Sequence, residues 1–394
     1  MKKEKCMREV VPAERVGRVE EYYFSRKLKE VSRLRAAGRD IINLGVGSPD
    51  LPPSPAVIET LCGHARRSDA HGYQPYTGIK ELRAGYGGWY KRWYGVELDS
   101  EVEILPLIGS KEGILHISLA FMNVGDKALV PNPGYPTYTS VTKLVGCEAE
   151  PYELSEAGGW KPDFEALERK DLSRVKLMWV NYPHMPTGTP GDAELFAKLV
   201  SFGRRHGIVI CHDNPYSFIL NARPESILQT AGAKEVCIEL NSMSKSHNMP
   251  GWRMAMLASN AKYVEWVLRV KSNVDSGQFQ AMQYAAVRAL ELGEEWYAGM
   301  NEVYASRREA AGEVLEAMGC VYAKNQVGLF LWGRIPSGEA SVESLTDRIL
   351  YGADVFVTPG MIFGSGGSGY VRVSLCCEAD RLLEAASRIR GLCG

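Results

Sequence analysis

The chain has 394 residues, of which 45% are hydrophobic and 24% charged, and its formal net charge is −1. This length and composition suit a globular enzyme with room for two domains and a sizeable core, and the near-neutral charge argues against nucleic acid or an anionic membrane as the main partner. The nine cysteines form no C-x-x-C pair and no zinc-like spacing, and the N-terminus lacks the apolar segment of a signal peptide. No stretch approaches a membrane span. We therefore expect a reducing, cytoplasmic setting.

The first part of the chain predicts an arm and one helix. Residues 1–18 predict an extended arm. From Val19 to Ala37 apolar side chains recur at helical spacing, and Gly38 suits a C-terminal cap. The next stretch, IINLGVG (41–47), predicts a short strand that breaks into a glycine- and proline-rich turn.

Strands and helices alternate through the rest of the chain. Helices are expected at 56–68 and 79–94, and buried strands at 102–108, 127–130, 175–181, 208–216, 236–240 and 254–258. Further on we expect a helix starting near 260, another at 293–318, short strands near 321 and 329–332, a helix at 342–351, two strands around a glycine-rich turn, and a last helix at 378–391. This alternation predicts an α/β fold with a mostly parallel sheet and helices on both faces.

One lysine follows the strand at 236–240, in the stretch SMSKSHNMPGWR. Apolar surroundings lower the pKa of a lysine, so Lys245 could be a nucleophile toward a carbonyl carbon. Ser242 and Arg253 are suited to gripping a phosphate group. An amine nucleophile beside a phosphate grip indicates pyridoxal phosphate. The same residues, taken alone, are also compatible with an ordinary solvated surface lysine.

Two more strand ends carry residues that could bind parts of such a cofactor. Gly109, Ser110 and Lys111 begin a helix whose unpaired N–H groups and dipole favour an anion. Asp213 ends the strand at 208–216, where ligands sit in open α/β sheets, although an Asp there is also a common helix cap. No P-loop and no G-x-G-x-x-G motif follows a strand, so these motifs do not support nucleotide binding.

Eight motifs in this order resemble the fold-type I pyridoxal-phosphate enzymes of aminotransferase class I/II, the group that includes aspartate aminotransferase. They are GVGSPD (45–50), YQPYTGIKELR (73–83), GSKEGI (109–114), PNPGYPTY (131–138), NYPHMPTG (181–188), DNPY (213–216), SMSKSHNMPGWR (242–253) and YVRVSL (370–375). The resemblance extends from about Ile41 to the last helix. The runs GSKEGILH and KSNVDSG are most similar to the branch that includes LL-diaminopimelate aminotransferase and relatives acting on aspartate or alanine.

The resemblance implies roles toward the cofactor. Lys245 would bind it covalently and move the substrate's α-proton. Asp213 would pair with the pyridine nitrogen, Tyr216 would contact the phenolic oxygen, and Tyr135 would stack on the ring, although a core tyrosine is an alternative for Tyr135. Tyr73 would reach the phosphate of the neighbouring subunit's cofactor, which implies a homodimer with shared active sites. A packing role is the alternative for Tyr73.

The resemblance also implies a site for the substrate carboxylate. Gly47 would meet it through the backbone and Arg372 through a bidentate pair. The alternatives are a plain turn for Gly47 and a structural strand arginine for Arg372. Met185 departs from the family, which has Asn there, so we expect it neither to donate to the phenolic oxygen nor to brace the arginine. Neither Asn181 nor His184 is assigned as its substitute.

These implications give an overall expectation. Residues 46–285 would form the large cofactor-binding domain with a seven-stranded sheet, and residues 286–394 a smaller α+β domain that residues 1–45 join. The protein would move an amino group between an L-amino acid and a 2-oxo acid, with aspartate, alanine or diaminopimelate-like donors, and without a metal. The alternatives are a pyridoxal-phosphate-dependent C–S lyase or decarboxylase, and a non-catalytic regulatory protein that binds the cofactor.

Overall fold

The computed structural model describes residues 10–17 and 23–393. Most of the predicted arm and the start of its helix therefore lie outside the described residues. Within the arm, residues 14–17 form the short helix α1 (Glu14–Gly17), where extended chain was expected. Helix α2 (Tyr23–Ala36) covers the described part of the predicted helix, and Gly38 follows it with a φ of 90°, in the left-handed region that suits glycine.

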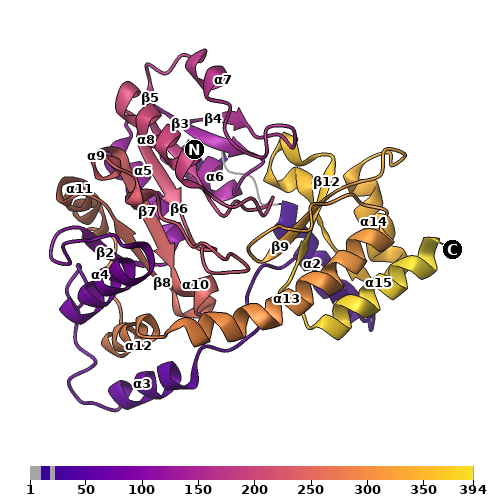
Figure 1. Cartoon of the computed structure of the whole chain (residues 1–394), viewed down its shortest axis with the longest axis horizontal. Coiled ribbons are helices and arrows are strands. Elements are labelled where there is room, and N and C mark those ends of the chain that lie inside the picture. The colour runs from indigo at the N-terminus through magenta and orange to yellow at the C-terminus, as the bar shows by residue number, and fades with distance from the viewer. Residues whose placement is uncertain (1–9, 18–22, 394) are drawn as a thin grey trace, which may run out of the picture.

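A seven-stranded sheet with the order β2-β8-β7-β6-β5-β3-β4 forms the large body of the molecule (Figure 1). Strand β8 is antiparallel to both of its neighbours, and every other pair is parallel, which confirms the predicted mostly parallel seven-stranded sheet. The strands are β2 (Ile104–Ile108), β3 (Lys127–Asn132), β4 (Glu148–Glu153), β5 (Val175–Val180), β6 (Val209–Asp213), β7 (Cys237–Ser242) and β8 (Met254–Ala258).

Both faces of this sheet are buried, which explains the nearly continuous apolar strands. In β5, Leu177 and Trp179 join the apolar core on one face, while Met178 and Val180 join the core on the other. The helices of this body are α3 (Pro55–Ala65), α4 (Lys80–Tyr94), α5 (Ser110–Phe121), α6 (Pro136–Leu144), α7 (Phe164–Glu168), α8 (Ala193–His206), α9 (Ala233–Val236), α10 (Met243–Ser246), α11 (Ala261–Lys271) and α12 (Gln280–Leu290).

A smaller antiparallel sheet, with the order β11-β12-β9, lies at the other end of the molecule. Figure 1 shows α13 (Glu294–Ala317) running from the large body toward it. The other elements of this C-terminal part of the chain are β9 (Phe330–Arg334), α14 (Val342–Ala353), β10 (Val355–Phe356), β11 (Thr358–Pro359), β12 (Tyr370–Ser374) and α15 (Ala379–Cys393). Short 3₁₀ turns are η1 (Ile227–Gln229), η2 (Pro250–Trp252), η3 (Gly360–Phe363) and η4 (Ser365–Gly367).

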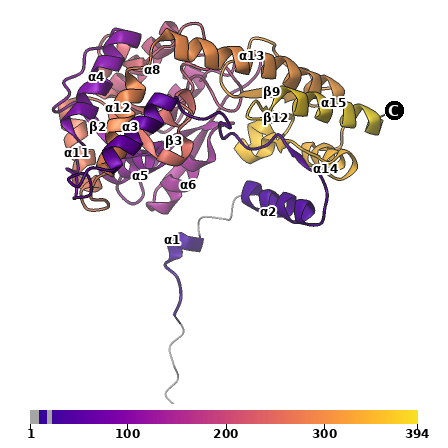
Figure 2. The same cartoon turned by 90° about the horizontal axis from the view of Figure 1, so that it is seen from below.

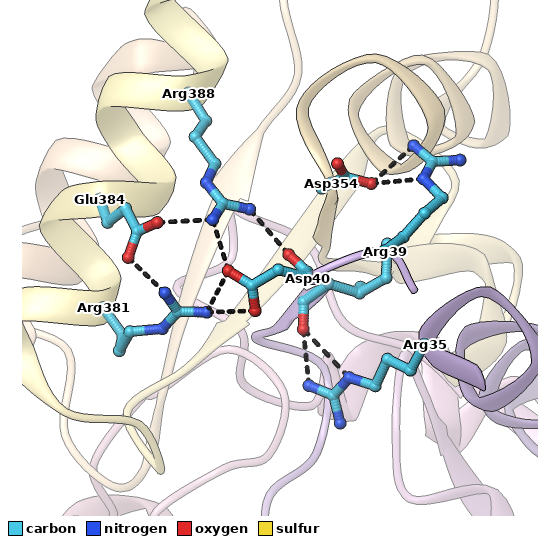
Figure 3. Close-up of polar contacts among 8 residues, drawn as sticks. Arg35, Arg39, Asp40, Asp354, Arg381, Glu384 and Arg388 are labelled. Atoms are coloured by element: carbon cyan, nitrogen blue, oxygen red, sulfur yellow. Dashed lines mark hydrogen bonds and ion pairs between the residues drawn. The ribbon is translucent and has the colours of Figure 1, made fainter. Parts of the chain in front are cut away.

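The segment after α2 is tied to these C-terminal elements. Strand β1 (Ile42–Asn43) pairs in parallel with β10. The Asp40 carboxylate accepts hydrogen bonds from Arg381 and Arg388 of α15, and Arg39 pairs with Asp354 at the end of α14 (Figure 3). Figure 2 shows α2 on the same side of the molecule as α14. Residues 23–45 thus pack with the C-terminal part of the chain rather than with the large sheet.

Within residues 10–17 and 23–393, no helix combines the length and the apolar character that crossing a bilayer requires.

Candidate active site

The predicted site residues gather at one edge of the large sheet. Strands β6 and β7 are parallel, and β8 is antiparallel to β7 and β2, so the carboxyl ends of β2, β6 and β7 lie where β8 begins. A cavity of about 1400 Å³ is lined by residues that follow these ends and by residues near the small sheet. Ten predicted residues line it: Gly47, Ser110, Lys111, Tyr135, Asp213, Tyr216, Ser242, Lys245, Arg253 and Arg372.

Lys245 lies in α10, directly after β7. Its ammonium donates a hydrogen bond to the carbonyl oxygen of Gly47 and so connects the large sheet to the segment that follows β1. Burial is the largest cause of a shift that lowers the pKa of Lys245 to about 8, while the neighbouring Cys376 opposes the shift. An amine with that pKa is partly neutral near pH 7 and can act as a nucleophile or a base.

A second group of residues offers a place for an anion. The hydroxyl of Ser110, in the first turn of α5, is buried and has no hydrogen-bond partner among the described residues. Gly109 precedes it with a φ of +82°, and a Cβ there would lie 2.0 Å from Nη2 of Arg253. Ser242 caps α10 by accepting a hydrogen bond from the Ser244 amide at 3.1 Å. The free N–H groups of α5 and the guanidinium thus meet at one point, which suits a phosphate. Gly109 itself does not line the cavity, but it makes room for Arg253.

The two carboxylate oxygens of Asp213 differ in their hydrogen bonding. Oδ2 accepts a hydrogen bond from Tyr138 at 2.9 Å, and the Tyr138 ring stacks on Trp179. Oδ1 is buried and has no partner among the described residues. Burial raises the pKa of Asp213 to about 6, against the lowering effects of Tyr138 and His212. A protonated ring nitrogen would give Oδ1 the donor it lacks and would favour the charged carboxylate.

Arg372, in β12, is buried between two aromatic rings. Its guanidinium carbon lies 3.9 Å from the ring centre of Phe330 and 4.7 Å from that of Phe363. Nη2 donates to the Gly45 carbonyl at 2.8 Å, and Nε has no partner among the described residues. Burial lowers the pKa of Arg372 to about 10. Met185 does touch this arginine, contrary to expectation, with Sδ 3.3 Å from Nη1, although a thioether is a weak acceptor.

The predicted tyrosines divide into two groups. Tyr135 and Tyr216 line the cavity, where Tyr135 meets Tyr138 edge to face and Tyr216 meets Phe330 in the same way. Burial raises the pKa of Tyr216, which keeps its hydroxyl protonated. Tyr73 is 94% exposed and does not line the cavity. Its predicted contact with a neighbouring subunit's cofactor stays a prediction.

Several lining residues were not predicted. Tyr138 falls within the motif PNPGYPTY, three positions after Tyr135, so its signal was present but unassigned. Phe330 and Phe363 come from segments with no sign of function in the sequence. The same is true of Arg26 and Arg33, which reach the cavity from α2.

Glu112, His116 and Asp275 bring potential metal ligands within 4.8 Å of one another. The ammonium of Lys271 already pairs with Asp275 at 2.7 Å, so a positive charge is present among these groups. We assign no metal to them.

The fold and the cavity together define a fold-type I pyridoxal-phosphate enzyme. At the carboxyl edge of the sheet they bring together a lysine of lowered pKa, an anion site at a helix start, and an aspartate with one carboxylate oxygen that accepts no hydrogen bond from the described part of the chain. Three buried polar atoms of cavity-lining residues have no partner among the described residues: Ser110 Oγ, Asp213 Oδ1 and Arg372 Nε. They fit a ligand with a phosphate, a ring nitrogen and a carboxylate-bearing substrate. The family comparison agrees, because residues 39–389 match aminotransferase class I and II. The chain belongs to this family and is a pyridoxal-phosphate-dependent aminotransferase.

Individual relatives cover almost the whole chain. A protein from Moorella thermoacetica named LL-diaminopimelate aminotransferase is 41% identical over 384 residues, which are 97% of this chain and 98% of that protein. One of the same name from Aquifex aeolicus is 40% identical over 90% of this chain and 92% of its own length. Among solved structures, BacF from Bacillus subtilis without ligand has a TM-score of 0.93 at 35% identity, with 98% of each chain covered. A probable N-succinyldiaminopimelate aminotransferase from Thermus thermophilus has a TM-score of 0.87 at 32% identity, covering 92% of this chain and 98% of that one.

Proposed function

We propose that the protein transfers the amino group of LL-diaminopimelate, or of a closely similar amino acid, to a 2-oxo acid. Support comes from the relatives named LL-diaminopimelate aminotransferase, which span both chains nearly end to end. The size of the cavity also supports it, since about 1400 Å³ leaves room for a long substrate beside a cofactor. We further propose a cytoplasmic location.

The proposed roles of the residues follow from the site. Bound pyridoxal phosphate supplies an aldehyde that takes up the amino group and a ring that accepts electrons from the substrate's α-carbon. The amine of Lys245 binds the cofactor covalently and, when released, moves the proton at the α-carbon, as its pKa of about 8 permits. Asp213 Oδ1 holds a proton at the ring nitrogen.

The remaining roles concern binding. The hydroxyls of Ser110 and Ser242, the start of α5 with Gly109 and Lys111, and the Arg253 guanidinium hold the phosphate. Tyr135 covers the ring, and the hydroxyl of Tyr216 donates to the phenolic oxygen. Arg372 and the backbone at Gly47 orient the substrate carboxylate, and the two rings beside Arg372 exclude water from the pair.

We also propose a homodimer in which Tyr73 completes the partner's phosphate site. The 94% exposure of this tyrosine in one chain supports the proposal, because an aromatic ring so exposed has most of its surface available for a partner. The proposed domains are residues 46–285, which contain the large sheet, and residues 286–394 together with 1–45, which contain the small sheets. Sedimentation would give the oligomeric state, and mixing Tyr73→Phe and Lys245→Ala chains would show whether sites are shared.

The observation on which the catalytic proposal rests is the half-buried Lys245, whose amine lies beside the Gly47 carbonyl and has a lowered pKa. The test supplies LL-diaminopimelate and 2-oxoglutarate and measures glutamate by mass spectrometry. Glutamate formed at a rate that requires Lys245 supports the proposal. Release of ammonia without glutamate would instead indicate a lyase. Borohydride treatment of the loaded protein should fix a label on the peptide that contains Lys245 and on no other.

A further inference from the structure

A buried lysine at the end of α11 has no role in the proposed function. Lys271 is 2% exposed, and its ammonium donates hydrogen bonds to the Asp275 carboxylate at 2.7 Å and to the backbone carbonyl oxygen of Tyr76 at 3.0 Å. Burying an ammonium is costly unless the charge is paired and hydrogen-bonded. Such a pair adds little net stability compared with apolar side chains of the same size, but it can hold the groups it bonds in one geometry. We call the ion pair and its bond to Tyr76 the Lys271 tether.

The segment that follows α11 packs against the same part of the chain as the lysine. Asp275 Oδ1 also accepts a hydrogen bond from the Gly277 amide at 3.0 Å, which closes a turn. Gly277 has a φ of +81°, and a Cβ there would lie 2.8 Å from the carbonyl oxygen of Gln74 and 2.9 Å from that of Pro75. The two backbones therefore meet with no room for a side chain between them.

These contacts all fall on residues 72–78, which we call the Tyr73 loop. The tether and Gly277 hold its backbone at 74–76, and the amide of Ile79, just beyond the loop, donates to the Gln283 side chain at 2.8 Å. Tyr73 itself is 94% exposed, so surrounding side chains do little to hold its ring. The position of this tyrosine consequently depends on the backbone that the tether fixes.

We propose that Lys271, together with Asp275, is a positioning residue for the neighbouring subunit's cofactor. It fixes the Tyr73 loop so that the Tyr73 hydroxyl reaches the phosphate held by the other chain. The inference rests on the proposed homodimer with shared sites. Lys271 contributes to the partner's site without touching the ligand there, because a loop that is already fixed loses less conformational entropy on binding than a loop that must first be ordered.

A second contact of the same segment leads to the chain's own phosphate site. The Gln278 side-chain amide donates to the Arg253 carbonyl oxygen at 2.7 Å. Through this contact a change in the segment could reach the guanidinium of the same chain. The two hydrogen bonds of the tether go to Tyr76 and Asp275 instead, which favours the route through the Tyr73 loop. The two routes serve the cofactors of different subunits, so mixed dimers separate them.

Two independent variants disturb the tether. K271M/D275N removes both charges together, so neither is left unpaired in the interior, and the new amide oxygen can still accept from Gly277. Gly277→Ala leaves the ion pair intact but forces the Tyr73 loop away from the segment. Lys262→Met is the control, since Lys262 is an exposed cation at the other end of α11. Calorimetry and sedimentation of the cofactor-free proteins show that each variant is folded and dimeric.

The first readout is the dissociation constant of pyridoxal phosphate, from absorbance titration. K271M/D275N and Gly277→Ala should each raise it by roughly 3-fold to 30-fold, as expected for partial loss of one charge-assisted hydrogen bond, and Lys262→Met should leave it unchanged. Combining Tyr73→Phe with K271M/D275N should weaken binding no more than Tyr73→Phe alone, because both changes act through the same hydroxyl. A purely structural role for Lys271 would make the two effects add.

The second readout uses mixed dimers that contain one chain with Lys245→Ala, in which only the other chain can be labelled by pyridoxal phosphate and borohydride. The label is measured against cofactor concentration. A wild-type chain paired with K245A/K271M/D275N should show the weakened site, because its phosphate is served by the disturbed loop. A K271M/D275N chain paired with Lys245→Ala should label with nearly wild-type affinity.

Weakening confined to the chain that carries K271M/D275N would overturn the proposal and assign the segment to Arg253 of the same chain. Unchanged affinity in both variants, or an effect that adds in full to that of Tyr73→Phe, would also overturn it. If Tyr73→Phe binds the cofactor as tightly as wild type, the shared site and the tether fail together. If only Tyr73→Phe weakens binding, the tether alone fails. None of these measurements needs turnover of LL-diaminopimelate, so the proposed amino transfer can fail separately.

Discussion

Gly109 is the position where the smallest change should do the most harm to the phosphate site. Its φ is +82°, and a Cβ would lie 2.0 Å from Nη2 and 2.7 Å from Cζ of Arg253. Gly109→Ala therefore imposes two separate costs. The backbone conformation of Gly109, with φ 82° and ψ 153°, costs a non-glycine residue about 1–3 kcal/mol. The methyl group also forces the guanidinium away from the start of α5.

Gly109→Ala should change both the free energy of unfolding and the affinity for pyridoxal phosphate. Arg253 is exposed to the cavity and can move, so the free energy of unfolding should fall by only about 1–3 kcal/mol, mostly from the backbone. With an unfolding entropy of about 2 cal/mol/K per residue, this lowers the melting temperature of a chain of this length by roughly 1–4 °C. Displacing Arg253 removes a charge-assisted contact of about 1.5–3 kcal/mol, so the dissociation constant of pyridoxal phosphate should rise by roughly 10-fold to 100-fold.

Gly251→Ala is the matched control. Gly251 is an exposed glycine of η2, two positions before Arg253, and a Cβ there would meet nothing within 4 Å. Scanning calorimetry of the cofactor-free proteins and titration with pyridoxal phosphate give both observables. Equal cofactor affinity in Gly109→Ala and Gly251→Ala would refute the reasoning, because it would mean that the guanidinium need not lie against the start of α5.

Two substitutions and one labelling experiment test Asp213, Arg372 and Lys245. Asp213→Asn should stabilise the cofactor-free protein above pH 6 by about 2–3 kcal/mol. The Asp213 pKa of about 6 exceeds that of an aspartate in the unfolded chain, so ionising this carboxylate costs folding stability as the pH rises from about 4 to 6. Denaturation at several pH values would show this. The same variant should bind the cofactor but transfer amino groups at least 100-fold more slowly. The rate at which Lys245 reacts with an aldehyde probe should rise with a midpoint near pH 8, and peptide mapping that places the midpoint above 10 would contradict the lowered pKa. Arg372→Lys should raise the KM of amino donors about 10-fold to 100-fold with a smaller change in kcat, and a collapse of kcat at unchanged KM would argue against carboxylate binding.

The large sheet could be predicted because its strands are buried on both faces and therefore appear as continuous apolar runs. Elements without that signal were missed. Strand β4 (EAEPYE) lies at the edge of the sheet and alternates polar residues, and α6, which begins within the motif PNPGYPTY, was not among the predicted helices. Proline at the first position of a helix explains that error, because it starts helices as readily as it marks turns.

The site could be predicted wherever a functional residue follows a buried strand in the chain. Lys245, Asp213 and Ser110 meet that condition, since parallel strands carry their ends to one edge of the sheet. Arg26 and Arg33, which also line the cavity, do not meet that condition. Their place at the cavity depends on how α2 packs against α14 and β10, which is long-range information that spacing along the chain does not contain.

Beneath the site lies a buried polar pair that explains why Asp213 is held where it is. His212 precedes Asp213 and points to the other face of β6, where Nδ1 lies 2.7 Å from the Glu239 carboxylate and Nε2 lies 2.8 Å from the Tyr182 carbonyl oxygen. The Tyr182 amide nitrogen also lies 3.3 Å from Nε2. Glu239 is the single charged residue of the apolar run VCIEL (236–240). The pair fastens β6 both to β7 and to the loop that follows β5. His212 also acts to lower the pKa of Asp213, against the effect of burial, and so favours the ionised carboxylate that would pair with a protonated ring nitrogen.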